Sequence, residues 1–105
     1  MKAIVVSKTG GPEVLELRDQ DPGAPGPGQA RVRVRAAGVN FVDVYHRTGL
    51  YPRPVPFVAG LEGAGVVESL GPGVTTVAVG DRVAWASAPG SYAEAVVAPV
   101  DRLLR

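Results

Sequence analysis

The sequence contains no cysteine and only one histidine, His46, among its 105 residues. The absence of cysteine excludes a disulfide-stapled scaffold, thiolate catalysis and any zinc site built on thiolates. It also fits a cytoplasmic protein, which is the localisation that we expect. A zinc site would need carboxylates for nearly all its ligands, which is unusual. We therefore expect no metal site, and we interpret His46 as an exposed or packed side chain on a short helix.

The chain also lacks an excess of charge and a long apolar run. Its formal net charge is +1, which gives no electrostatic basis for binding nucleic acid or an anionic membrane. No stretch approaches the roughly 20 apolar residues that a membrane helix needs, and the apolar start is too short for a signal peptide. We expect neither a nucleic acid partner nor membrane insertion. Alternating arginine and valine over residues 31–35 indicate the solvated face of a strand.

Glycine and proline are plentiful, with 14 and 10 residues, and they cluster between short apolar runs. A short helix is predicted over residues 40–48, with Asn40 as its N-cap and Gly49 just after its end. The proline-rich residues 51–57 are expected to be extended and irregular. With about seven short strands, the pattern favours one all-β barrel or sandwich domain over residues 1–105. The strands are predicted at residues 1–6, 14–18, 30–37, 60–70, 79–84 and 91–98, with a further start at 103–104.

No pattern in the chain predicts a catalytic or nucleotide-binding loop by itself. A serine nucleophile would need a Gly-x-Ser-x-Gly turn, which is absent. The glycines of residues 60–65 follow Gly-x-x-Gly-x-Gly rather than the Rossmann spacing Gly-x-Gly-x-x-Gly, and valines come after them. We interpret these glycines as part of a strand, where they permit bulges and close approach of the backbone.

Five segments in order along the chain resemble quinone oxidoreductases of the medium-chain dehydrogenase/reductase superfamily, the zeta-crystallin-like group. They are GGPEVL (10–15), AGVNFVDVYHRTGLY (37–51), PFVAGLEGAGVV (56–67), VGDRVA (79–84) and GSYAE (90–94). Five motifs in the family order are far more specific than any one of them. The resemblance implies a GroES-like catalytic domain, a mainly β, partly open barrel with one or two short helices.

The same resemblance shows where the chain departs from the zinc enzymes of the superfamily. Zinc alcohol dehydrogenases carry a cysteine where this chain has Asn40, a histidine where it has Leu61, and a four-cysteine lobe that is absent here. Asparagine and leucine cannot replace thiolate and imidazole as zinc ligands. The resemblance therefore implies a zinc-free enzyme, in which hydrogen bonds polarise the substrate carbonyl.

The resemblance also implies the site residues. Asn40 would lie at the nicotinamide and substrate end of the cleft, where its amide would donate to a quinone or nicotinamide oxygen. Tyr45 and Tyr51 are the other catalytic candidates, because a phenol can donate to a developing oxyanion and wall an aromatic site. Asn40, Phe41 and Tyr45 are the candidate cofactor-binding residues. The structural alternatives are a helix cap for Asn40, half-buried core positions for the tyrosines and packing for Phe41.

Other noticeable side chains are interpreted as structural. Asp43 is expected to cap the helix or to pair with Arg47, four residues further along it. Glu62 is expected to support the site rather than to act in it. Trp85 and Tyr92 are expected in the core.

The function implied by the resemblance is zinc-independent transfer of hydride from NADPH to a quinone or another small electrophilic carbonyl. NADPH would be bound mainly by a Rossmann domain, which follows such a segment in longer family members and is missing from residues 1–105. We therefore expect no turnover from this chain alone, and a homodimer for the full-length enzyme.

Two other functions remain open. One is a zinc-free enoyl reductase of the same superfamily, which would act on acyl thioesters. The other is a stand-alone GroES-like binding module without enzymatic activity, because a fold alone does not define a function.

Overall fold

Two antiparallel sheets, one α-helix and two 3-10 helices form the chain in a computed structural model that describes all 105 residues, 1–105. The elements are β1 (Lys2–Val6), η1 (Pro12–Val14), β2 (Leu15–Asp19), β3 (Gln29–Gly38), α1 (Phe41–Thr48), β4 (Phe57–Val58), β5 (Glu62–Leu70), β6 (Arg82–Trp85), β7 (Ala95–Pro99) and η2 (Val100–Arg102). The prediction of a mainly β, partly open barrel with one or two short helices is confirmed.

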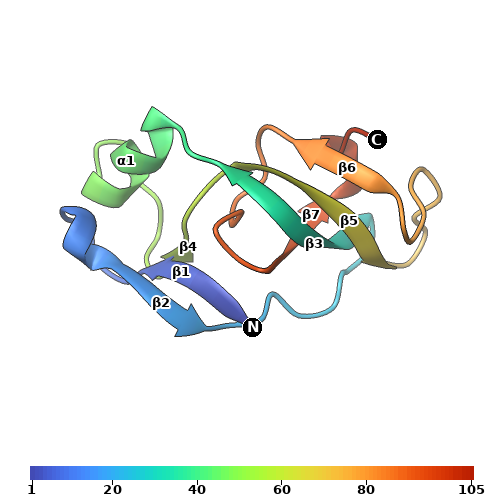
Figure 1. Ribbon diagram of the computed structural model, residues 1–105, viewed down its shortest axis with the longest axis horizontal. Coiled ribbons are helices and arrows are strands. Elements are labelled where there is room, and N and C mark those ends of the chain that lie inside the picture. The colour runs from blue at the N-terminus through green and yellow to red at the C-terminus, as the bar shows by residue number, and fades with distance from the viewer.

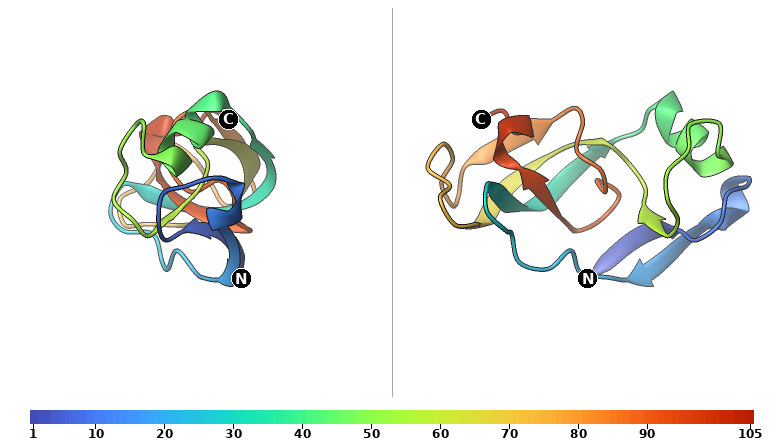
Figure 2. Two further views of the ribbon diagram at one scale, coloured as in Figure 1. Left: turned by 90° about the vertical axis from the view of Figure 1, so that its left-hand side faces the viewer. Right: turned by 180° about the vertical axis from the view of Figure 1, so that it is seen from behind.

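The N-terminal sheet has the order β2-β1-β4, with β1 in the centre. β1 pairs with β2 from Lys2↔Asp19 to Val6↔Leu15, and with β4 at Val5↔Val58. A small apolar cluster of Val6, Val14, Phe57 and Ala59 lies at this sheet. In Figure 1 this sheet and α1 lie in the left half of the molecule, whereas the C-terminus lies on the right. The view from behind in Figure 2 shows the same separation.

The second sheet has the order β6-β5-β3-β7 and holds the main core. β3 alternates as its sequence predicts, because Ala30 and Val32 are buried while Arg33 and Arg35 are exposed. Arg31 differs from its neighbours, since it is half-buried and pairs with both Asp21 and Glu68. The main core comprises Ala30, Val32, Val67, Val77, Val83, Trp85, Ala88, Val96, Ala98 and Leu103. Trp85 is thus in the core, as expected.

The structure corrects several predicted strand boundaries. Val14 belongs to η1, so β2 begins at Leu15, and Phe57 lies in β4 rather than in irregular chain. The strand predicted at 91–98 is only β7, Ala95–Pro99. The preceding residues cross from one sheet to the other, because Ile4 donates to the Tyr92 carbonyl and Val34 donates to the Glu94 carbonyl. The glycines of 60–65 do enter a strand, β5.

Candidate functional site

Asn40 lies just before α1, where one carboxylate accepts from its backbone N–H and another accepts from its side-chain amide. Its backbone is extended at the N-cap position, as predicted. Its backbone N–H donates to Asp43 Oδ2 at 3.0 Å, and its side-chain Nδ2 donates to Glu62 Oε1 at 2.7 Å. The bond to Glu62 was not predicted, and it brings β5 into contact with the start of the helix. Asn40 is itself exposed.

Asp43 is a nearly buried carboxylate, with 8% of its surface exposed. Its Oδ2 accepts from the Tyr92 hydroxyl at 2.6 Å as well as from the Asn40 N–H, whereas its Oδ1 has no partner. The predicted capping role of Asp43 is confirmed. The predicted pairing with Arg47 is wrong, because Arg47 Nε donates instead to the Gly10 carbonyl at 3.2 Å. Tyr92 is half-buried rather than fully in the core, since its hydroxyl reaches Asp43.

The Asp43 carboxylate acts electrostatically on two basic side chains, Arg53 and His46. Burial lowers the pKa of the Arg53 guanidinium, and the Asp43 carboxylate opposes this. Burial also lowers the pKa of His46, the Arg53 charge lowers it further, and Asp43 opposes both. Arg53 Nη1 and His46 Nδ1 are buried without a partner. His46 is therefore a packed histidine that favours its neutral form, in agreement with the expected packed position.

The aromatic candidates lie on and just after α1. The rings of Tyr45 and Tyr51 meet edge to face with centroids 5.1 Å apart, and the Tyr51 N–H donates to the Tyr45 carbonyl at 3.2 Å. This edge-to-face contact stabilises both ring positions, although Tyr45 is only half-buried and Tyr51 is 52% exposed. The Phe41 side chain is 82% exposed, so the alternative interpretation that it packs against the rest of this chain is wrong. Its side chain is available to a ligand or to further protein.

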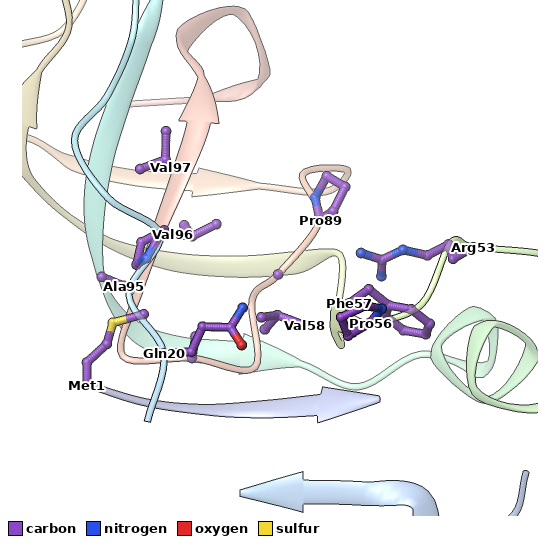
Figure 3. Close-up of a pocket in the computed structure, with 13 residues that line it drawn as sticks. Met1, Gln20, Arg53, Pro56, Phe57, Val58, Pro89, Ala95, Val96 and Val97 are labelled. Carbon is purple, nitrogen blue, oxygen red and sulfur yellow. The ribbon is translucent and has the colours of Figure 1, made fainter. Parts of the chain in front are cut away.

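Two hollows in the surface differ in how close they come to Asn40. One, of about 440 Å³, runs over β3, β5 and β6 and is bordered by Gly38, Glu62 and Trp85, so it opens next to the Asn40 partner. The other, of about 260 Å³, is shown in Figure 3, where Arg53 lies over the Phe57 ring near Pro89. None of Asn40, Phe41, Tyr45 or Tyr51 lines either hollow.

No group of three or more histidine, cysteine, aspartate or glutamate side chains is arranged to hold a metal ion. No helix has the length and apolarity needed to span a membrane.

Residues 26–105 match the family model of the alcohol dehydrogenase GroES-like domain. The chain belongs to this family. The GroES-like domain is 52% identical over 105 residues to a quinone oxidoreductase of Pseudomonas aeruginosa, covering 98% of the chain and 32% of that protein. It is 44% identical over 109 residues to a 2-haloacrylate reductase of Burkholderia, and this match covers 98% of the chain and 32% of that protein. The resemblance to quinone oxidoreductases drawn from the five segments is thereby confirmed.

A solved structure supports the same relationship. The quinone oxidoreductase of Escherichia coli in complex with NADPH superposes with a TM-score of 0.96 at 38% identity, over 99% of this chain and 32% of that one. The GroES-like domain thus spans about a third of the length of these relatives.

Two features of the GroES-like domain could not be found by reasoning from the sequence. The first is the bond between Asn40 and Glu62, which are 22 positions apart. The only signal was that Gly38 and Glu62 both lie in the matching segments. The second is the electrostatic coupling between Arg53 and Asp43, which nothing in the proline-rich stretch indicated.

Proposed function

We propose that this GroES-like domain supplies the substrate end of a zinc-independent, NADPH-dependent quinone oxidoreductase. The observations that carry the proposal are the fixed amide of Asn40 at the start of α1 and the edge-to-face tyrosine pair towards its end, in a chain 52% identical to a quinone oxidoreductase. Preorganised polar groups and aromatic side chains at one helix are the kinds of group that suit a flat carbonyl substrate. The enzyme would be cytoplasmic and homodimeric, with no nucleic acid partner and no membrane insertion.

Zinc independence is supported by the side chains present. Neither Asn40 nor Leu61 offers the thiolate or imidazole of a zinc site, and the chain has no cysteine. Without a Lewis acid, polarisation of the carbonyl falls to hydrogen bonds from Tyr45, Tyr51 and the free N–H of Asn40. Quinones fit this chemistry because their low-lying acceptor orbitals require less activation than those of a ketone.

The residues at the start of α1 also fit the nicotinamide end of NADPH, which supplies hydride when bound. Phe41 offers an exposed aromatic face, and Asn40 offers an amide whose orientation is fixed. With Tyr45, these residues would hold and orient the ring. The rest of the dinucleotide would be held by a separate Rossmann domain, as the family resemblance implies.

Reduction of an unsaturated acid derivative is the second candidate. It is favoured by the 44% identity to a 2-haloacrylate reductase, because haloacrylates are unsaturated acids. This activity would make the protein a zinc-free enoyl reductase that uses the same Asn40 and tyrosine pair.

A chimera tests the two candidates together. The chain replaces the aligned segment of the Pseudomonas aeruginosa quinone oxidoreductase, and NADPH oxidation is measured with a simple quinone and with an enoyl thioester. We expect quinone reduction by the chimera, none by the 105-residue chain alone, and a loss of about 10- to 100-fold in kcat/KM for Asn40→Ala or Tyr51→Phe. Glu13→Gln, at an exposed residue of η1, is the matched control.

The outcomes separate the candidates. Reduction of the thioester but not the quinone would favour the enoyl reductase. A folded chimera that reduces neither substrate would favour the binding module, and full turnover by the chain alone would contradict the need for a second domain.

A further inference from the structure

We propose that Glu62 is a positioning residue that fixes the amide of Asn40, and that Gly38 is a glycine because the Glu62 side chain occupies the space of its missing Cβ. This inference rests on the proposed function for its catalytic consequence. The contact itself can be tested without any activity.

The orientation of the Asn40 amide follows from the chemistry of its partner. Nδ2 lies 2.7 Å from Glu62 Oε1, and an ionised carboxylate only accepts hydrogen bonds. The NH2 group must therefore face Glu62, which directs Oδ1 away from it. Charge-assisted bonds of this kind are about twice as strong as neutral ones. Glu62 thus sets which end of the amide a ligand meets.

The backbone of Asn40 is held separately, so the side chain has a fixed base. Asp43 accepts the Asn40 backbone N–H at 3.0 Å, and the Tyr92 hydroxyl holds Asp43 in place at 2.6 Å. Two carboxylates from α1 and β5 therefore bind the same residue from different sides. Of these two carboxylates, only Glu62 contacts the side-chain amide, whose other end faces the Asp43 backbone N–H in the capping box.

Gly38 provides independent support for this role. It is the register partner of Glu62 between β3 and β5. A Cβ at Gly38 would lie 2.5 Å from Glu62 Oε2 and 2.9 Å from Cγ, closer than real atoms approach. Gly38 is not among the glycines with positive φ, so its backbone does not require glycine. The Glu62 side chain is the group that a Cβ at this position would meet and displace.

The consequence for binding is a defined pattern of hydrogen-bonding groups at the start of α1. Asn40 presents one free N–H and the remaining lone pair of Oδ1, which also faces the Asp43 backbone N–H in the capping box, next to the hollow bordered by Glu62 and Gly38. A primary carboxamide, such as that of a nicotinamide ring, carries the complementary donor and acceptor. With the amide reversed, the acceptor and the donor would exchange places and the pattern would no longer match.

The contact is tested by NMR on the chain itself. Asn40 is the only asparagine, and Gln20 and Gln29 are the only glutamines, so three side-chain carboxamides are observed. We expect Glu62→Ala and Gly38→Ala to shift the Asn40 side-chain amide resonances in the same direction. The Gln20 and Gln29 resonances serve as internal controls and should stay in place.

The two substitutions act differently, which keeps the test decisive. Gly38→Ala displaces the Glu62 carboxylate without removing it, whereas Glu62→Ala removes it from the exposed side of the strand. If Gly38→Ala fails to fold, Glu62→Ala decides alone. Unchanged Asn40 resonances in the folded variants would overturn the proposal.

The catalytic consequence is tested in the chimera. Glu62→Ala and Gly38→Ala should each lower kcat about tenfold with little change in the KM for quinone, and Glu62→Gln should recover part of the loss because its Oε1 still accepts. If Asn40→Ala lowers kcat but the Glu62 and Gly38 variants do not, the positioning role is wrong. An inactive parent chimera would overturn the proposed function, and the NMR result would then decide whether Glu62 fixes Asn40.

Discussion

Asp43 shows how this chain accommodates a charge away from water. A buried carboxylate costs several kcal/mol unless hydrogen bonds replace its hydration. Oδ2 receives two such bonds, from the Asn40 N–H and the Tyr92 hydroxyl, and Arg53 contributes a nearby positive charge. The position of α1 therefore depends on a tyrosine that lies 49 positions further along the chain.

The first prediction concerns this tyrosine. Tyr92→Phe keeps the ring but removes the hydroxyl donor, so the free energy of unfolding should fall by about 1.5–3 kcal/mol, the usual value for a hydrogen bond to a charged group. Urea denaturation measures it. Tyr51→Phe is the control, because Tyr51 is half exposed, and it should change stability by less than about 0.5 kcal/mol. Equal losses in the two variants would show that the bond to Asp43 contributes little.

The second prediction concerns Asp21. Asp21 Oδ1 accepts from Arg31 Nη1 at 2.6 Å and from the Gly23 N–H at 2.7 Å. These two hydrogen bonds lower the pKa of Asp21 from 3.8 to about 2. Any stability from this carboxylate is therefore present above pH 3.8 and is lost as the pH falls through about 2.

NMR titration of Asp21 checks the value directly. Arg31→Leu should raise the pKa of Asp21 towards 3.8, whereas Arg33→Leu should leave it unchanged, because Arg33 pairs only with Glu68. A similar response to both substitutions would mean that general charge, and not the direct contact, sets the pKa.

At the scale of the element, α1 is too short to be stable by itself. It has eight residues, and isolated helices shorter than about 12–15 residues are marginal in water. Its two ends are held instead. Asn40 and Asp43 form the first end, and Arg47 exchanges two hydrogen bonds with Gly10 near the last turn.

The third prediction concerns the residue that ends this helix. Gly49 has φ 90°, and its N–H donates to the Tyr45 carbonyl. Gly49→Ala should lower the free energy of unfolding by about 1–2 kcal/mol, because side chains with Cβ disfavour the left-handed region. Gly49→Asn should cost less, since asparagine visits this region more readily. Thermal unfolding compares the two, and equal losses would point to contact with Thr9 instead.

Features of the fold were predicted correctly from the sequence where the residues that determine them are close together in the chain. β3, the α1 boundaries and the Asn40 cap were predicted correctly, because alternation and capping are read over a few residues. Only the first half of the strand expected at residues 91–98 was wrong, because residues 91–94 bond to β1 and β3, whereas Ala95–Pro99 form β7. The Glu62 contact with Asn40 depends on cross-strand register, which no local pattern contains.

At the scale of the whole molecule, many large apolar side chains remain at the surface. They are Leu15, Leu17, Val39, Phe41, Leu50, Tyr51, Val55, Val79 and Leu104. Four of them lie within or next to α1. Exposed apolar groups of this kind mark surfaces that favour contact with other protein.

The fourth prediction follows from this surface. We expect the purified chain to self-associate with rising concentration, as measured by sedimentation velocity, and Phe41→Lys to reduce the association. Thr48→Lys adds the same charge at another exposed position of α1 without removing apolar area. The two variants should therefore differ. A monomer at every concentration, or equal effects of the two lysines, would contradict the prediction.

The central place of β1 has a consequence for the time course of folding. Its partners are β2, β4 and, through Ala3, the distant Ala93. A strand whose pairings are so far apart in sequence must wait for long loops to close, and such topologies fold slowly. During synthesis β1 therefore stays incompletely paired until Ala93 has emerged from the ribosome.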